Sequence, residues 1–269
     1  MNTRLTKEDQ AMIKEAKGNK VSGPIYSEDG LRLLKVLGNP EYLEVKDGVK
    51  AICDEACQGL DNLHDVVLPA SVTDLGTRAF ASCIKLFKIT MPGVDFIGIE
   101  SFAHCENLKE IALPETLGKI RKAAFADCKA LEEINIPSHL KIIDKSAFRN
   151  SGLKSLNIEI SDGGKCLVYD KAFASCKHLE SVYLNKNVKI VERMAFADCT
   201  SLKTIEFEQP SLTCCAGEIN ATMLIGCTSL EKIIVPKNKY NHYPDFNIQG
   251  YESAQFETRD FNSLVTPKE

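Results

Sequence analysis

The pentapeptide AFADC occurs twice in this chain, at 124–128 and 195–199, so its copies lie 71 residues apart. Similar short motifs occur before the first copy and between the two copies. Counted over all six motifs, successive phenylalanines are 22, 23, 23, 25 and 23 residues apart. A period of this length is typical of structural units that stack on one another. The phenylalanines are Phe80, Phe102, Phe125, Phe148, Phe173 and Phe196.

Each repeat has the same apolar pattern. An aliphatic residue stands five places before the Phe, a Cys (Ser151 in one unit) stands three places after it, and an L-x-x-I-x-L word follows, often closed by Pro. The last two apolar residues of that word are two apart, as on one face of a β-strand. The spacing of three in A-F-x-x-C-x-x-L fits a short helical or 3₁₀ turn. One unit cannot bury its own apolar face, so we expect about eight stacked units over residues 52–236 with a continuous core.

The full pattern I-G-x-x-A-F-x-x-C-x-x-L-x-x-I-x-L-P is similar to the BspA-like, or Treponema pallidum-type, class of leucine-rich repeat. It stands here as LGTRAFASCIKLFKITMPGVDFI and IRKAAFADCKALEEINIPSHLKII, and covers about two thirds of the chain. The resemblance implies an α/β repeat solenoid, a right-handed leucine-rich repeat superhelix with a parallel β-sheet on its concave face and short helical or 3₁₀ turns on its convex face. It also implies a recognition role, in a family often found on cell surfaces. The family's motif has no catalytic residues to carry over.

The repeat also sets the domain organisation. We expect an N-terminal helix and tail at 1–25, an N-terminal cap at 26–51, the solenoid at 52–236, and a C-terminal cap and tail at 237–269. A helix is predicted at 6–17, because Thr6 and Asp9 resemble a capping box and Gly18 follows as a stop. Two units carry insertions, EISDGGKCL and EQPSLTCCAGE, which become loops in a solenoid.

The eleven cysteines are interpreted as packing residues. Most occupy one repeat position, where a small, soft apolar side chain fits a tight turn. The alternative is a redox or metal-loading column, but stacked turns point their Cβ atoms in parallel, which disfavours disulfides. The chain has no C-x-x-C and its five histidines are scattered, so we predict no metal site and no cofactor. The pair Cys214–Cys215 lies in an insertion and is the better candidate for a reactive thiol.

Composition limits the possible partners. The net charge of −4 lacks the basic excess that nucleic acids and anionic membranes attract, so we expect no nucleic-acid partner. No apolar run approaches the length of a membrane span, and the polar start MNTRLTKEDQ lacks a secretory signal. The chain is therefore expected to be cytoplasmic as written, or at the cell surface or secreted if a signal peptide was removed.

Candidate contact residues are the strand positions that do not enter the core and so point to the expected concave face. The middle of this column is acidic, and its C-terminal part offers an aromatic and an aliphatic side chain, which recognition surfaces use. The alternative reading is an ordinary solvated face. The predicted contact residues are Asp65, Val67, Lys88, Thr90, Glu110, Ala112, Glu133, Asn135, Asn157, Tyr183, Glu206 and Ile234.

These features favour a monomeric, non-enzymatic module that binds a protein or peptide on the concave sheet. The alternative is a surface or adhesion protein of the BspA-like type. Catalysis is disfavoured, because the chain contains no G-x-x-x-x-G-K-[ST], H-E-x-x-H or G-x-S-x-G motif. No catalytic residue is predicted.

Overall fold

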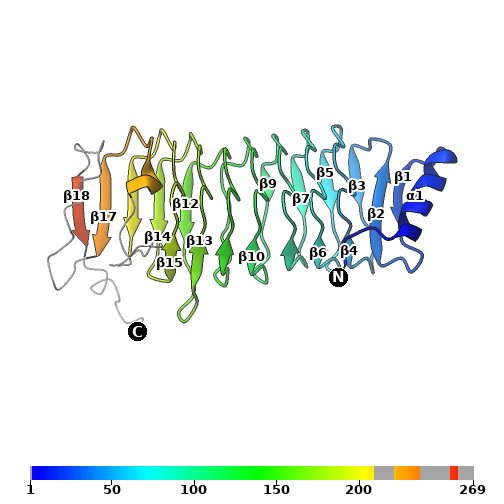
Figure 1. The fold of residues 1–269 in the computed structure, drawn as a ribbon, viewed down its shortest axis with the longest axis horizontal. Helices are drawn as coiled ribbons and strands as arrows, with labels where there is room; N and C mark the ends of the chain where they lie inside the picture. The colour runs from blue at the N-terminus through cyan, green and yellow to red at the C-terminus, as the bar shows by residue number, and fades with distance from the viewer. Residues whose placement is uncertain (1, 209–220, 237–254, 260–269) are drawn as a thin grey trace.

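The computed structural model describes residues 2–208, 221–236 and 255–259, and shows coils stacked along one long axis (Figure 1). A typical coil supplies a strand to each of two rows of strands and a turn that carries the repeat's phenylalanine. This arrangement confirms the predicted repeat solenoid. The pair Cys214–Cys215 and most of the expected C-terminal cap lie outside the described residues.

The chain begins with a helix, α1, which spans Lys7–Gly18 and confirms the predicted element. The capping box is present: the Asp9 N–H donates to the Thr6 hydroxyl over 3.1 Å, and the Thr6 N–H donates to the Asp9 carboxylate over 2.8 Å. Strand β1 (Gly23–Tyr26) then pairs antiparallel with β2 (Arg32–Leu37). No helix in the described ranges combines the length and apolar character that crossing a bilayer requires.

One row of strands forms a nine-stranded sheet that the sequence pattern did not predict. Its order is β1-β2-β4-β6-β8-β10-β11-β13-β15, with parallel pairing after β2. Most of these strands are only two or three residues long, and each coil's aliphatic residue five places before Phe points inward from one of them. The further strands are β4 (Ala51–Ile52), β6 (Asp74–Leu75), β8 (Phe96–Ile97), β10 (Lys119–Ile120), β11 (Ile142–Ile143), β13 (Cys166–Val168) and β15 (Val188–Val191).

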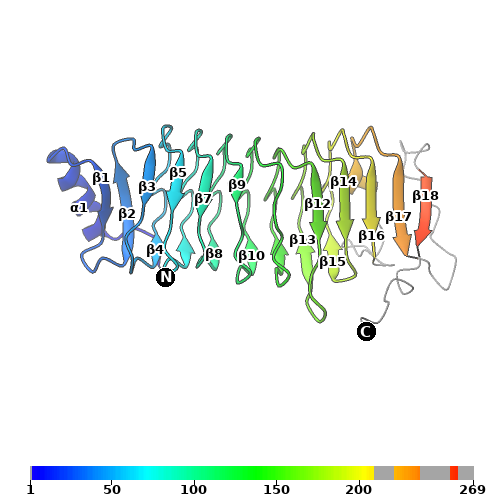
Figure 2. The same cartoon turned by 180° about the vertical axis from the view of Figure 1, so that it is seen from behind.

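The L-x-x-I-x-L words form the second row of strands, which is interrupted and which we call the split sheet. Its two parts have the orders β3-β5-β7-β9 and β12-β14-β16-β17-β18, all in parallel pairing. Figure 2 shows both rows running along the solenoid. The strands are β3 (Tyr42–Glu44), β5 (Asp65–Val67), β7 (Lys88–Thr90), β9 (Glu110–Ile111), β12 (Ser155–Ile158), β14 (Ser181–Leu184), β16 (Thr204–Phe207), β17 (Lys232–Pro236) and β18 (Gln255–Arg259).

The six repeat phenylalanines form a continuous column in the core, as predicted. Each side chain is fully buried. Successive rings stack with centroids 5.2–5.5 Å apart and planes within 9° of parallel. The Phe column therefore joins each coil to the next from Phe80 to Phe196.

The turn around each phenylalanine is a pair of tight turns rather than the expected helical or 3₁₀ segment. In the coil of Phe125, Ala123 and Asp127 adopt left-handed backbone conformations with φ of 52° and 63°. The Phe125 N–H donates to Ala147 O of the next coil over 2.8 Å, which makes this segment a third ladder between coils. Every second N–H group of this segment, from Ala123, Phe125 and Asp127, points to the next coil instead of along a helix. A 3₁₀ helix, η1, is present at Ala221–Leu224.

The cysteine column has a defined hydrogen-bonding role in addition to packing. All nine cysteines in the described residues are buried. The Cys105 thiol donates to Phe80 O, one coil earlier, over 3.1 Å, and the same contact recurs in most later coils. A thiol is a weak donor, so it satisfies a carbonyl inside an apolar turn at low cost. Burial raises the pKa of Cys83 to about 12, which keeps that thiol protonated.

Gly152 lies where the SGL word is one residue shorter than its CKAL counterpart. A Cβ atom at Gly152 would come within 2.0 Å of Lys129 O, so the backbone would have to shift. We expect Gly152→Ala to lower the free energy of unfolding by about 1–3 kcal/mol, as overpacked sites do. The control is Gly118→Ala, where an added Cβ meets nothing within 4 Å. Urea denaturation measures both, and equal midpoints for the two variants would contradict the close approach.

Candidate functional site: the split-sheet face

The predicted contact residues lie on the outer face of the split sheet. Parallel pairing places Asp65, Lys88 and Glu110 in one row and Asn157, Tyr183 and Glu206 in another. Val67 and Thr90 are likewise in register on β5 and β7. Ala112, Glu133 and Asn135 belong to segments without strand structure, next to the interruption of the sheet. The face is therefore two surfaces, separated by one coil.

One predicted contact residue does not face solvent. Ile234 on β17 is only 3% exposed, so the expectation that it contributes an apolar contact surface is wrong. Strand β17 lies between β16 and β18, and an ion pair spans it: Arg259 Nη1 of β18 lies 2.6 Å from Glu206 Oε1 of β16. The pair runs across the outer face of β17, which accounts for the burial of Ile234.

The interruption of the split sheet is confined to the coil that contains residues 133–136. Across the described residues, no backbone–backbone hydrogen bond joins this segment to the coil on either side. Pairing is present at both of its ends, since Lys154 N donates to Glu132 O over 3.0 Å and Ser161 N donates to Ser138 O over 2.8 Å. Figure 2 shows this coil passing between β9 and β12 without an arrow in the row of the split sheet. The opening is thus short and enclosed.

Asn135 holds the opening apart on one side. Its amide takes the place of a backbone peptide group: Leu113 N–H donates to Asn135 Oδ1 and Asn135 Nδ2 donates to Leu113 O, each over 2.9 Å. Asn is disfavoured in strands because its side chain competes for backbone hydrogen bonds. The carboxylates of Glu110 and Glu133 also occupy successive positions in one column, where like charges weaken pairing. Both effects favour separation of these two coils.

A crevice of about 700 Å³ lies at the opening, and aliphatic side chains such as Ile111 and Ile134 line it together with charged ones. Six of the twelve predicted contact residues line it: Lys88, Thr90, Glu110, Ala112, Glu133 and Asn135. Sequence reasoning missed its apolar floor, because those positions were assigned to the core, and its ends, where prolines close the strands and Lys109 was given no role. The missed lining residues are Ile89, Met91, Pro92, Lys109, Ile111, Leu113, Pro114 and Ile134.

The charged side chains on the face are partly paired with one another. Lys88 Nζ lies 2.7 Å from Glu110 Oε2, and this contact raises the pKa of Lys88. The Tyr183 hydroxyl donates to Glu208 Oε1 over 2.6 Å, and burial together with that hydrogen bond raises the pKa of Tyr183. Glu133 is exposed and makes no ion pair within the described residues. Lys154 interacts electrostatically with Glu133 but forms its ion pair with Glu132, so Glu133 keeps room for a cationic partner.

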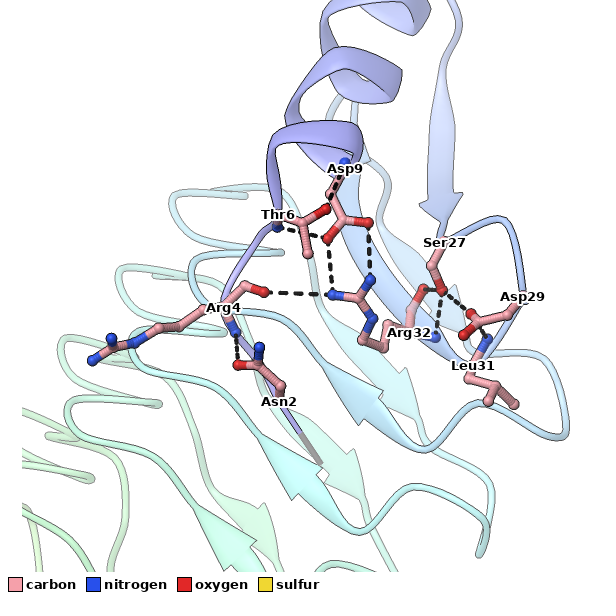
Figure 3. A network of polar contacts seen from close by, with 8 residues as sticks. All are labelled: Asn2, Arg4, Thr6, Asp9, Ser27, Asp29, Leu31 and Arg32. Carbon is pink, nitrogen blue, oxygen red and sulfur yellow. Dashed lines mark hydrogen bonds and ion pairs between the residues drawn. The ribbon is translucent and has the colours of Figure 1, made fainter.

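A second polar cluster lies at the N-terminal end and serves the fold. Arg32 forms a bidentate ion pair with Asp9 (2.8 and 3.0 Å) and also donates to Arg4 O, so it fastens α1 and the preceding segment to β2 (Figure 3). Asp9 is 3% exposed. Because its polar groups bond to one another, the cluster offers no obvious ligand site. In the described residues, no group of three or more His, Cys, Asp or Glu side chains is placed to hold a metal ion.

Comparison with known proteins identifies the repeat. The sequence profile of the BspA type Leucine rich repeat region (6 copies) matches residues 50–163 and 166–255. Among solved structures, a leucine-rich repeat protein of T. pallidum is 25% identical, over 70% of this chain and 83% of that chain, with a TM-score of 0.45. A leucine-rich cell surface protein of Faecalibacterium prausnitzii is 20% identical, over 79% and 86%, with a TM-score of 0.42. None of the curated proteins compared with the chain matches it significantly.

Proposed function

The chain belongs to the BspA-type leucine-rich repeat family, and from that premise we propose that it is a non-enzymatic interaction module that binds a protein or peptide on the split-sheet face. The crevice at the interruption is the observation that carries this proposal. It gathers half of the predicted contact residues around an apolar floor. A partly apolar patch with a polar rim is the usual anatomy of a recognition surface.

The kind of partner follows from the chemistry of the face. The repeat motif of the family has no catalytic residues, and the cysteine column is buried and hydrogen-bonded to backbone carbonyls. The face has more carboxylates than cationic groups, which disfavours a nucleic-acid ligand. A rigid scaffold with an elongated face suits an extended segment or a protein surface, because little ordering entropy is lost from the scaffold on binding.

The test is affinity capture with matched baits. The wild-type chain and a triple variant, Glu110→Lys with Glu133→Lys and Tyr183→Ala, are exposed to the lysate and the surface fraction of the source cell. The control carries the same change of charge and one tyrosine truncation away from the face: Glu15→Lys with Glu28→Lys and Tyr169→Ala. Circular dichroism confirms that all three baits are folded.

We expect a partner that the wild type and the control retain and the triple variant loses. Adhesion at a cell surface, the alternative function, predicts that this partner comes from outside the cell or from a neighbouring cell's surface fraction. A partner held equally by the wild type and the triple variant would place the binding site away from the split-sheet face and so refute the proposal.

A further inference from the structure

The opening in the split sheet exposes side chains that elsewhere belong to the core. In neighbouring coils, the side chains that point inward from the split sheet are buried: Ile89 and Leu156 are each 3% exposed. The equivalent Ile111 and Ile134 are only partly buried, and so is Ile136. The interrupted ladder therefore gives solvent access to aliphatic side chains that point into the solenoid.

The same opening leaves backbone groups in need of partners. Residues 133–136 make no backbone–backbone hydrogen bond, and exposed peptide groups must bond to water or to a ligand. An extended peptide supplies N–H and C=O groups together with side chains. A wholly apolar ligand would leave these backbone groups unsatisfied, so the crevice favours a polypeptide.

The charge of the surroundings adds a preference for cationic side chains. In the N-terminal part of the face the outward charged residues are Glu44, Asp65, Lys88, Glu110 and Glu133; four carboxylates and one ammonium group give a net charge of −3. The one base, Lys88, is paired with Glu110. A cationic side chain beside the crevice can pair with the carboxylate of Glu133, which forms no ion pair of its own within the described residues.

Lys109, at the end of the crevice, does not reverse this preference. It lies in a neighbouring column of alternating charge in which Lys154 Nζ is 2.8 Å from Glu132 Oε2. The pKa of Glu132 is lowered by Lys154 first and by Lys109 to a smaller extent, so Lys109 lies within electrostatic range of this carboxylate. Counting Lys109 together with the five outward charged residues still leaves the surroundings of the crevice with a net charge of −2.

We propose that the crevice binds an extended segment of the partner through one aliphatic side chain, which packs against Ile111 and Ile134, flanked by a Lys or Arg that pairs with Glu133. This inference rests on the proposed function and specifies the chemistry of the partner. Ala112 lies on the lining, so a large residue there would fill the crevice without disturbing the core.

The proposal is tested by NMR on the full chain with ¹³C-labelled isoleucine methyl groups. The probe is the peptide acetyl-Gly-Ser-Lys-Leu-Lys-Ser-Gly-amide, with Leu→Ser and Lys→Glu versions as matched peptides. We expect saturable shifts at the methyl groups of Ile111, Ile134 and Ile136, and none at Ile205, which is buried in an intact part of the sheet. Each changed peptide should bind at least tenfold more weakly.

Variants of the protein separate the two contacts. Ala112→Trp should abolish the shifts, and Glu133→Gln should weaken the Lys peptide while leaving the Glu peptide unchanged or slightly stronger. Glu15→Gln on α1 is the control and should bind like wild type. No shift at the three isoleucines, or equal binding of the Leu and Ser peptides, would overturn the proposal. So would shifts of these methyl groups that rise with protein concentration alone, since a second copy would then be the occupant.

A captured partner distinguishes this inference from the proposed function. A partner lost by Ala112→Trp as well as by the triple face variant supports both. A partner retained by Ala112→Trp but lost by the triple variant refutes the crevice and leaves the split-sheet face as the binding surface. A partner retained by both refutes the two together.

Discussion

Phe125→Ala is expected to lower the free energy of unfolding by about 3–5 kcal/mol, the range for truncation of a buried aromatic side chain. Phe125 is fully buried, and its ring stacks at 5.2 Å on both Phe102 and Phe148. The substitution removes apolar contact with two neighbouring coils and leaves a cavity between them. Urea denaturation followed by circular dichroism and by intrinsic tyrosine fluorescence measures the loss and tests whether unfolding remains cooperative.

Phe87→Ala is the matched control for that experiment. Phe87 is partly exposed and stacks on His64 with ring centroids 5.3 Å apart, outside the Phe column. Its truncation should cost about 1 kcal/mol, which is typical of a single aromatic pair. A loss below about 1 kcal/mol for Phe125→Ala would mean that the column does not carry the coupling between coils that its geometry indicates.

Asp9→Ala is expected to detach α1 from the solenoid. The substitution removes the capping box and leaves the Arg32 guanidinium, whose side chain is 15% exposed, without its carboxylate. Breaking a buried ion pair by removing one partner costs about 3–5 kcal/mol. Amide hydrogen exchange should show protection lost across Lys7–Gly18 while the Phe column stays protected.

The double variant Asp9→Ala with Arg32→Met sharpens the interpretation. It removes the unpaired charge, so it should recover part of the docking that Asp9→Ala loses. Glu15→Ala, on the exposed side of α1, should leave protection unchanged. Full protection of α1 in Asp9→Ala would show that the ion pair does not hold the helix.

The same contact predicts a dependence on pH. Burial by itself raises the pKa of Asp9, but hydrogen bonds from the Thr6 N–H and from Arg32 outweigh it, so the pKa lies below its ordinary value of 3.8. The stability that this carboxylate contributes is therefore fully present above about pH 4 and is lost as the pH falls through the lower folded pKa. Protection of α1 should stay constant from neutral pH to about pH 4 and decline below it.

Much of this fold could be predicted because the buried residues recur at a nearly constant interval in the sequence. The Phe column follows from a fixed interval, and α1 follows from Thr6 and Asp9 at capping-box spacing. The second sheet could not be predicted in the same way. Strands such as β6 and β8 are so short that each contributes one inward residue, Leu75 or Ile97, and a single residue has no alternation to recognise.

The site was predictable as a column of positions but not as a shape. Outward strand positions identify Lys88, Glu110 and Glu133 correctly as neighbours on one face. The crevice depends instead on Asn135, whose side chain replaces a backbone bond of Leu113. An Asn within a strand motif is only a weak indication that backbone pairing between coils will be interrupted. Nothing in the sequence specifies which backbone groups the Asn135 amide will bond to. Tertiary contacts between residues 23 positions apart, such as Asp9 and Arg32, likewise have no signal in the sequence.

The interruption of the split sheet also bears on how the array unfolds. In a stacked protein, cooperativity comes from the coupling energy between nearest neighbours. Across the coil of residues 133–136 that coupling retains the Phe column, the nine-stranded sheet and the turn ladder of Phe125 N–H to Ala147 O, but lacks the backbone ladder of the split sheet. The coupling between coils is therefore weaker at this junction than elsewhere in the array. Local unfolding that begins at either end is expected to halt there. We therefore expect the two parts of the array to unfold as separate cooperative units, divided at the same coil that opens the crevice.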